Sequence, residues 1–129
     1  MIHRTLIIGR WVADFLFATE GYDIEGVLGC LWDAHAPRHS ISQAERLMLS
    51  CSRNCGFTYS NPHYRRAVVL IGPTTSGAEF LNTFVHEVRH LADGIAKSLG
   101  VDLDSESPAY LAGETARALA DTVCMLGCQ

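Results

Sequence analysis

The sequence predicts one α+β domain over residues 1–129, a small antiparallel sheet packed on helices that lie on one side of it. Segments rich in β-branched and aromatic residues occur near the N-terminus and between residues 56 and 71. Apolar residues recur at helical spacing between these segments and after them. With 129 residues, of which 48% are hydrophobic, the chain is long enough to bury a core.

The first elements to be expected are two strands, residues 4–8 and 11–18, that form a hairpin around Gly9-Arg10. Asp23 is a good N-cap for a helix that stops before Pro37. A second helix is expected to open at Ser42, where Ser42-Gln43-Ala44-Glu45 has the pattern of a capping box.

The next elements are a strand over residues 56–60, a turn at Asn61-Pro62 and a strand over Arg66–Ile71. A second capping box, Ser76 to Glu79, starts a long helix that should run to Leu99 and stop at Gly100. A short acidic loop over residues 101–104 leads into one last helix that reaches almost to the end.

Charge and hydropathy favour a cytoplasmic protein. The formal net charge of −4 predicts no nucleic-acid partner and no anionic membrane surface as a partner. No apolar run approaches the ~20 residues of a membrane helix, and the apolar run near the N-terminus is too short for a signal peptide.

The five cysteines do not indicate a disulfide framework, because their number is odd. The pairs Cys51/Cys55 and Cys124/Cys128 have i,i+4 spacing, but structural zinc sites usually use the tighter C-x2-C spacing. We expect reduced thiols at these positions.

The segment His86-Glu87-Val88-Arg89-His90 matches the pattern H-E-x-x-H. Residues i and i+4 of a helix lie one turn apart on one face, so His86 and His90 can bind the same Zn²⁺ ion. Zinc lowers the pKa of a bound water to ~7, and Glu87 is placed to act as the general base for that water. The apolar stripe of this helix, Leu81, Phe84, Val88, Leu91, Ala92, Ile95 and Leu99, lies on the other side. His35 and His39 have the same spacing, but Pro37 breaks a helix between them, so no metal role is expected there.

A catalytic zinc ion needs a third protein ligand. One large group of H-E-x-x-H enzymes has a His six residues after the second His, and here Ala96 excludes that group. Two carboxylates remain, Glu106 and Glu114. A tight antiparallel hairpin of helices favours Glu114, whereas an extended return of residues 99–106, which span ~23 Å, allows Glu106 to arrive.

The stretch from Phe57 to Glu87, together with Glu106-Ser107-Pro108-Ala109-Tyr110-Leu111, resembles small zincin-type proteins encoded by bacteriophages and bacterial mobile elements. These proteins carry H-E-x-x-H followed by E-x-x-A-Y-L and are similar to gluzincin peptidases. The resemblance implies a zinc metallopeptidase that acts on a peptide or protein. It makes Glu106 the third ligand and Tyr110 a polar group near the metal. It also implies that the strand Arg66–Ile71 is the edge strand that aligns the substrate.

Other roles near the metal stay open at this point. Asp93 lies one turn beyond His90 and is either an orienting partner of a ligand imidazole or a solvated carboxylate. Tyr110 is the first candidate for an oxyanion stabiliser, and Tyr59, His63 and Tyr64 follow. The alternative to an enzyme is a zinc-binding structural or regulatory module without turnover. A fourth protein ligand such as His63 would favour that module.

Overall fold

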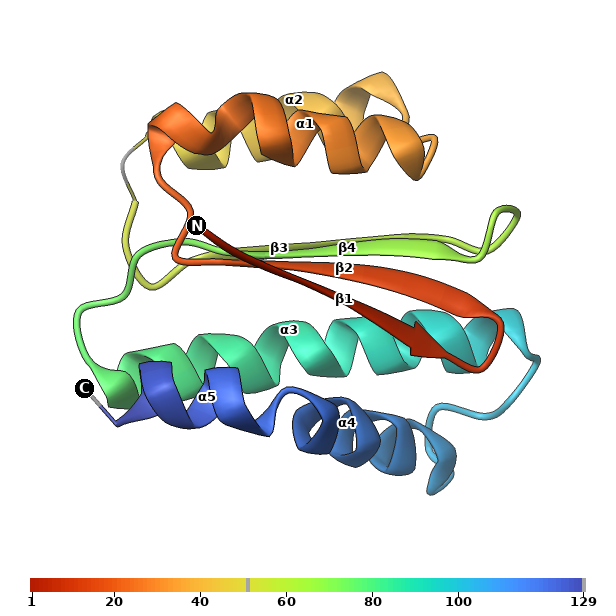
Figure 1. Ribbon diagram of the computed structural model, residues 1–129. Coiled ribbons are helices and arrows are strands. Elements are labelled where there is room, and N and C mark those ends of the chain that lie inside the picture. Colours follow the sequence, from red (N-terminus) through yellow and green to blue (C-terminus); the bar gives the residue numbers. More distant parts are fainter. Residues whose placement is uncertain (51, 129) are drawn as a thin grey trace.

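The computed structural model describes residues 1–50 and 52–128, and in it a four-stranded sheet lies between two groups of helices (Figure 1). The strands are β1 Ile2–Ile8, β2 Trp11–Phe17, β3 Gly56–Asn61 and β4 Arg66–Ile71, in the sheet order β1-β2-β4-β3. The helices are α1 Ile24–Asp33, α2 Arg38–Leu49, α3 Gly77–Ser98, α4 Ser107–Ala118 and α5 Ala120–Gly127, with a short 3-10 helix at Gly21–Asp23. The α+β class is confirmed.

The sheet is mixed, so the prediction of an antiparallel sheet is wrong for its centre. β1 pairs with β2 and β3 pairs with β4, both antiparallel, which confirms the expected N-terminal hairpin. β2 and β4 run parallel, from Val12 beside Arg66 to Phe17 beside Ile71. Parallel neighbours need a long crossover connection, and here α1, α2 and β3 together supply it.

Helices cover both faces of the sheet, whereas the sequence predicts helices on one side only. α1 and α2 lie over one face, and α3, α4 and α5 lie over the other (Figure 1). The reason is visible in β2, whose residues Phe15 and Phe17 point to one face while Leu16 points to the other. All three are fully buried, so each face of the strand needs a covering layer.

Two hydrophobic clusters result, one on each side of the sheet. Phe15, Phe17, Phe80, Phe84 and Leu91 belong to the cluster beneath α3. The cluster beneath α1 and α2 includes Leu16, Leu31, Met48, Val68 and Leu70. Of the predicted apolar stripe of α3, Leu81 and Leu99 are exposed and the other members are buried.

α3, the helix with the H-E-x-x-H segment, has the predicted ends. Ser76 is its N-cap, and the Ser76 hydroxyl oxygen accepts a hydrogen bond from the Glu79 backbone N–H at 3.1 Å. The helix ends at Ser98, and Gly100 adopts a φ of +71°, the left-handed conformation that favours glycine after a helix.

Two other helix boundaries differ from the predictions. α2 begins at Arg38 instead of Ser42, with Pro37 as its N-cap. Proline is tolerated at a helix start because it has no N–H to leave unpaired. The expected single C-terminal helix is divided into α4 and α5 at Leu119, a fully buried residue.

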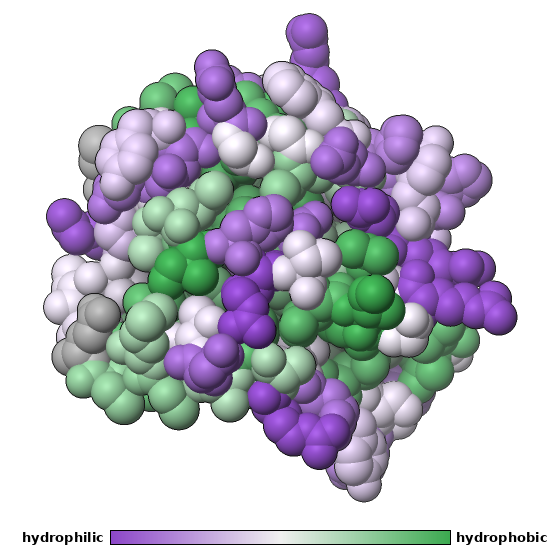
Figure 2. Space-filling view, viewed as in Figure 1, coloured by the Kyte–Doolittle hydropathy of each residue, from purple (hydrophilic) through white to green (hydrophobic). Residues whose placement is uncertain are grey.

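The surface that carries β1 mixes hydrophilic and hydrophobic residues (Figure 2). Ile7 of β1 is 79% exposed on the molecule's surface. Within residues 1–50 and 52–128, no helix combines the length and apolar character needed to cross a membrane.

Candidate metal centre

The two histidines of the H-E-x-x-H segment converge on one point beside α3. Both side chains are exposed, and their Nε2 atoms lie 3.1 Å apart with the rings nearly perpendicular, at 82°. Two nitrogen ligands of a tetrahedral zinc ion, with Zn–N bonds of about 2.05 Å, lie about 3.3 Å apart. The spacing of His86 and His90 therefore fits a shared zinc ion.

Glu87, between the two histidines in sequence, points inward instead of into solvent. The residue is only 5% exposed, and its Oε2 accepts a hydrogen bond from the Thr58 hydroxyl of β3 at 2.8 Å. Its other oxygen, Oε1, lies 3.9 Å from His86 Nε2. One carboxylate oxygen is thus held by the sheet while the other faces the histidines. Ligand atoms of all three residues lie within 4.8 Å of one another.

Small residues on β3 make room for this carboxylate. Gly56, Thr58 and Ser60 alternate with Phe57 and Tyr59, which pack on the opposite side of the sheet. A Cβ atom on Gly56 would lie 2.6 Å from Glu87 Cγ and 3.1 Å from the Leu70 carbonyl oxygen. The position of Glu87 therefore depends on the missing side chain at residue 56.

A second close approach lies two helical turns further along α3. A Cβ atom on Gly94 would lie 2.9 Å from the Ser60 hydroxyl oxygen. Gly94 follows His90 by one turn and His86 by two, so these three residues form one stripe of α3 facing β3. Glycine and serine let the helix lie directly against the strand here.

A cleft of about 510 Å³ opens beside this stripe. His86, Glu87 and His90 form one wall, and Ser40 and Gln43 of α2 line the cleft with residues 56–60 of β3. A second hollow of about 360 Å³ also includes His86 and Glu87 and is lined by Asn54, Asn82 and Thr83. His86 and Glu87 therefore border both hollows, and His90 borders the larger one.

The structure places both candidate third ligands outside the group formed by His86, Glu87 and His90. Glu106 is exposed and precedes α4 as its N-cap. Glu114 forms an ion pair with Arg117 on α4 and lines a different hollow, against β1. The loop before α4 does return along α3, because the Leu103 carbonyl oxygen accepts a hydrogen bond from Arg89 Nη2 at 3.5 Å. Glu106 follows that contact by three residues.

The predicted oxyanion candidates are spread over the molecule. Tyr110 is 71% exposed on α4 and is not among the residues that line the cleft. His63 and Tyr64 lie in the turn after β3, where Tyr64 stacks on His35 with ring centroids 3.7 Å apart. Only Tyr59, among these four, lines the cleft. Burial raises the pKa of the Tyr59 hydroxyl, and a hydrogen bond with Asn61 partly offsets the rise.

The structure bears on two further residues or strands for which the sequence suggested a role near the metal. The Asp93 carboxylate is bound by Arg89, at 2.8 Å from Arg89 Nε, which places it in an i,i+4 ion pair on α3. Strand β4 lies between β2 and β3, so it is not an edge strand. The edge strand beside the histidines is β3, because the sheet ends there.

Of the paired cysteines, the described ones, Cys55, Cys124 and Cys128, do not belong to the group formed by His86, Glu87 and His90. Cys51 lies outside the described residues, and the Cys55 thiol donates to the Arg53 carbonyl oxygen at 3.3 Å. Cys124 and Cys128 are free and exposed at the end of the chain.

Comparisons with protein-family models, with curated proteins and with solved structures found no match for this chain. The similarity to gluzincin-like proteins therefore stays a prediction.

Proposed function

We propose that this protein is a zinc-dependent metallopeptidase in which His86 and His90 hold the metal and Glu87 is the general base. The observation that carries the proposal is the arrangement of these three side chains. Two imidazole nitrogens meet at zinc-ligand spacing, and a buried carboxylate has one oxygen anchored and the other directed toward them. This arrangement lies in an open groove instead of a closed cavity.

Zinc, when bound, supplies a Lewis acid for a carbonyl oxygen and makes hydroxide available at neutral pH. Glu87 accepts the proton of the attacking water and passes it to the leaving amine. Thr58 holds Oε2 of Glu87, which leaves Oε1 for this proton transfer. Tyr59 also lines this cleft, but its side chain packs on the opposite face of the sheet from Glu87.

The groove suits an extended peptide. β3 is an edge strand, so one side of it has main-chain N–H and C=O groups that are not used within the sheet. A peptide that pairs with β3 would pass the histidines on one side and Gln43 of α2 on the other. Ser40, Gln43 and Ser60 would give polar contacts with the peptide main chain.

The first test uses variants of the motif itself. Glu87→Gln should keep stoichiometric zinc and lower the cleavage rate by roughly 10²- to 10⁴-fold, because only the base is lost. His90→Ala should bind one equivalent of zinc less than the wild type, whereas the control His39→Ala should bind the wild-type amount, because His39 is exposed on α2 and does not line the cleft. Metal content is measured by elemental analysis and cleavage with a pooled library of quenched fluorescent peptides. Wild-type protein without stoichiometric zinc would refute the proposal.

A second test concerns the third ligand, for which we propose Glu106. The return of the preceding loop to Arg89 supports this choice, as does the position of Glu114 against β1. Glu106→Gln should weaken zinc binding by at least about 100-fold, because even outer partners of a ligand contribute 10- to 100-fold. Glu114→Gln is the matched control, and zinc loss in that variant alone would assign the ligand to Glu114 instead.

A zinc-binding module without turnover is the second candidate, and one observation favours it. Among the described residues, the carboxylate that meets the two imidazoles is Glu87, not Glu106. If Glu87 is itself a ligand, no base remains beside the metal. Glu87→Gln would then lose zinc, the opposite of the result expected for the peptidase, so the same variant separates the two functions.

A further inference from the structure

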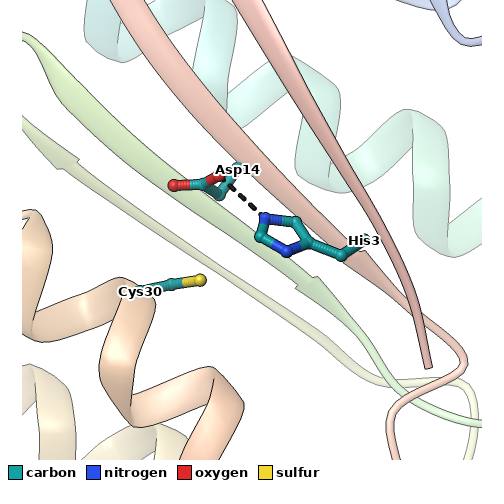
Figure 3. A group of neighbouring side chains, drawn as sticks. All are labelled: His3, Asp14 and Cys30. Atoms are coloured by element: carbon teal, nitrogen blue, oxygen red, sulfur yellow. Dashed lines mark hydrogen bonds and ion pairs between the residues drawn. The ribbon is translucent and has the colours of Figure 1, made fainter.

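A second group of ligand-type side chains lies on the opposite face of the sheet from α3. His3 of β1, Asp14 of β2 and Cys30 of α1 point toward one another (Figure 3). One ligand atom of each lies within 4.8 Å of the others, and His3 Nε2 is 2.9 Å from Asp14 Oδ1. Three separate elements thus bring an imidazole, a carboxylate and a thiol together.

The strand register explains why these residues meet. Thr5 pairs with Asp14 and His3 pairs with Leu16, so His3 lies diagonally opposite Asp14 on the same face of the sheet. Leu16 faces the hydrophobic cluster beneath α1 and α2, and Asp14 shares that orientation. Cys30 reaches the same point from α1, which packs over this face (Figure 1).

Asp14 has an unusual environment for a carboxylate, because its side chain is only 8% exposed. Burying a charge is unfavourable unless partners surround it. Oδ1 accepts from the Thr5 hydroxyl at 2.8 Å and contacts His3, while Arg66 Nη2 lies 3.5 Å from Oδ2. The carboxylate is therefore fixed in direction, with Oδ2 steadied by Arg66 and Oδ1 turned toward His3.

The surroundings of Cys30 disfavour the thiolate form of its side chain. Burial, and then the charges of Asp14 and Asp33, raise the pKa of Cys30 to about 11, and Arg66 offsets only part of this rise. Reactive cysteines have lowered pKa values instead. A metal ion removes this obstacle, because a coordinating thiol is deprotonated by the ion.

We infer that His3, Asp14 and Cys30 form a second binding site for Zn²⁺, separate from the centre at His86. Thiolate sulfur, imidazole nitrogen and carboxylate oxygen are the three ligand types that zinc combines in proteins. His3 is 43% exposed, so an ion has a path from solvent and a solvent molecule can complete the tetrahedron. Bound there, zinc links α1 to the β1–β2 hairpin.

The test begins with a double variant, His86→Ala with His90→Ala, which removes the first centre and leaves this one. Zinc titration of the metal-free double variant should find one equivalent bound. Adding Cys30→Ser or His3→Ala should weaken that binding at least about 100-fold. Adding Cys124→Ser, a change at an exposed free thiol, should leave it unchanged.

Co²⁺ as a probe gives a second readout. In the double variant, Co²⁺ should produce a sulfur-to-metal charge-transfer absorption that disappears with Cys30→Ser and persists with Cys55→Ser. His3→Ala keeps the test valid if Cys30→Ser does not fold, because His3 is exposed on the surface of β1. A double variant that binds no zinc, or binding that survives both Cys30→Ser and His3→Ala, would overturn the inference. Neither result would affect the proposal for His86 and His90.

Discussion

Glu87 is a buried acidic residue whose orientation depends on one neighbour. Its Oε2 accepts the Thr58 hydroxyl hydrogen, and Thr58 belongs to a strand that precedes it by almost thirty residues. Hydrogen bonds to charged groups contribute about 1.5–3 kcal/mol, more than those between neutral groups. Thr58 is thus a positioning residue for the proposed base.

Replacing Thr58 by valine keeps the shape and removes the donor. Thr58→Val should lower the rate of peptide cleavage by between about 10- and 100-fold, because Oε1 is no longer aimed at the histidines. It should also lower the free energy of unfolding by about 1–3 kcal/mol, since a buried oxygen loses its partner. Peptide cleavage, zinc analysis and urea unfolding measure the three effects.

The control is Thr58→Ser, which retains the hydroxyl and should restore most of the rate. Zinc content should be the same in all three proteins. Equal loss of activity in the serine and valine variants would mean that Thr58 acts through packing instead of through its hydrogen bond.

The sequence predicts that His86, Glu87 and His90 lie close together, because helical spacing alone brings such residues together. The contribution of Thr58 and Gly56 could not be predicted in the same way. Their contribution depends on which strand packs beside α3, and tertiary packing instead of local sequence decides this. Strand alternation places residues 56, 58 and 60 on one face, and their small size is the only local signal of a close helix.

The strand β3 and the helix α3 together form the part of the cleft that contains the proposed site. The two elements approach closely at Gly56 beside Glu87 and at Ser60 beside Gly94, so both glycines leave space that a side chain would fill. A larger residue at either position has to move the helix, the strand or the carboxylate.

Gly56→Ala tests this packing. The added methyl group would lie 2.6 Å from Glu87 Cγ and 3.1 Å from the Leu70 carbonyl oxygen. Overpacking of this kind costs about 1–3 kcal/mol, and cleavage should fall because Glu87 is displaced. Thermal unfolding and peptide cleavage measure the two consequences.

Gly113→Ala is the matched control, since Gly113 lies inside α4 and a Cβ atom there meets nothing within 4 Å. Alanine is a better helix former than glycine, so this variant should gain about 0.5–1 kcal/mol. A Gly56→Ala protein as stable and active as Gly113→Ala would show that the contact with Glu87 is unimportant.

Elements with strong local signals were predicted well. β4 has the predicted bounds, and the Ser76 cap and Gly100 stop define α3. α2 was misplaced because the capping-box pattern at Ser42 lies inside a helix that Pro37 already starts. The parallel pairing of β2 with β4 carries no local signal, since it joins strands that are far apart in the chain.

For the molecule as a whole, the first strand and the last helix are joined by one arginine. Arg4 Nη1 lies 2.9 Å from Asp121 Oδ1 and 2.8 Å from the Thr122 hydroxyl oxygen. Two hydrogen bonds lower the pKa of Asp121 below its ordinary value of 3.8. The larger effect comes from Arg4 and the smaller one from the Thr122 backbone N–H. This tie connects the two ends of the described chain.

The tie predicts a pH-dependent effect of Arg4→Met. A carboxylate with a lowered pKa in the folded state stabilises the fold above its ordinary pKa, and this stabilisation is lost as the pH falls through the lowered value. The variant should therefore unfold at lower urea concentration than wild type above pH 5, and the difference should narrow below pH 3.8. A difference that stays constant down to pH 2 would show that Asp121 does not contribute through Arg4.

The mixed sheet also has a consequence for the order in which the chain folds. Each hairpin, β1 with β2 and β3 with β4, closes over a short stretch of chain, whereas the pairing of β2 with β4 must close a loop that contains α1, α2 and β3. Pairings of high sequence separation form slowly. Thr58, His86, Glu87 and His90 all belong to the second hairpin and the helix that follows it, whereas the groove around them also needs Ser40 and Gln43 of α2. The joining of the two hairpins would then be the rate-limiting event.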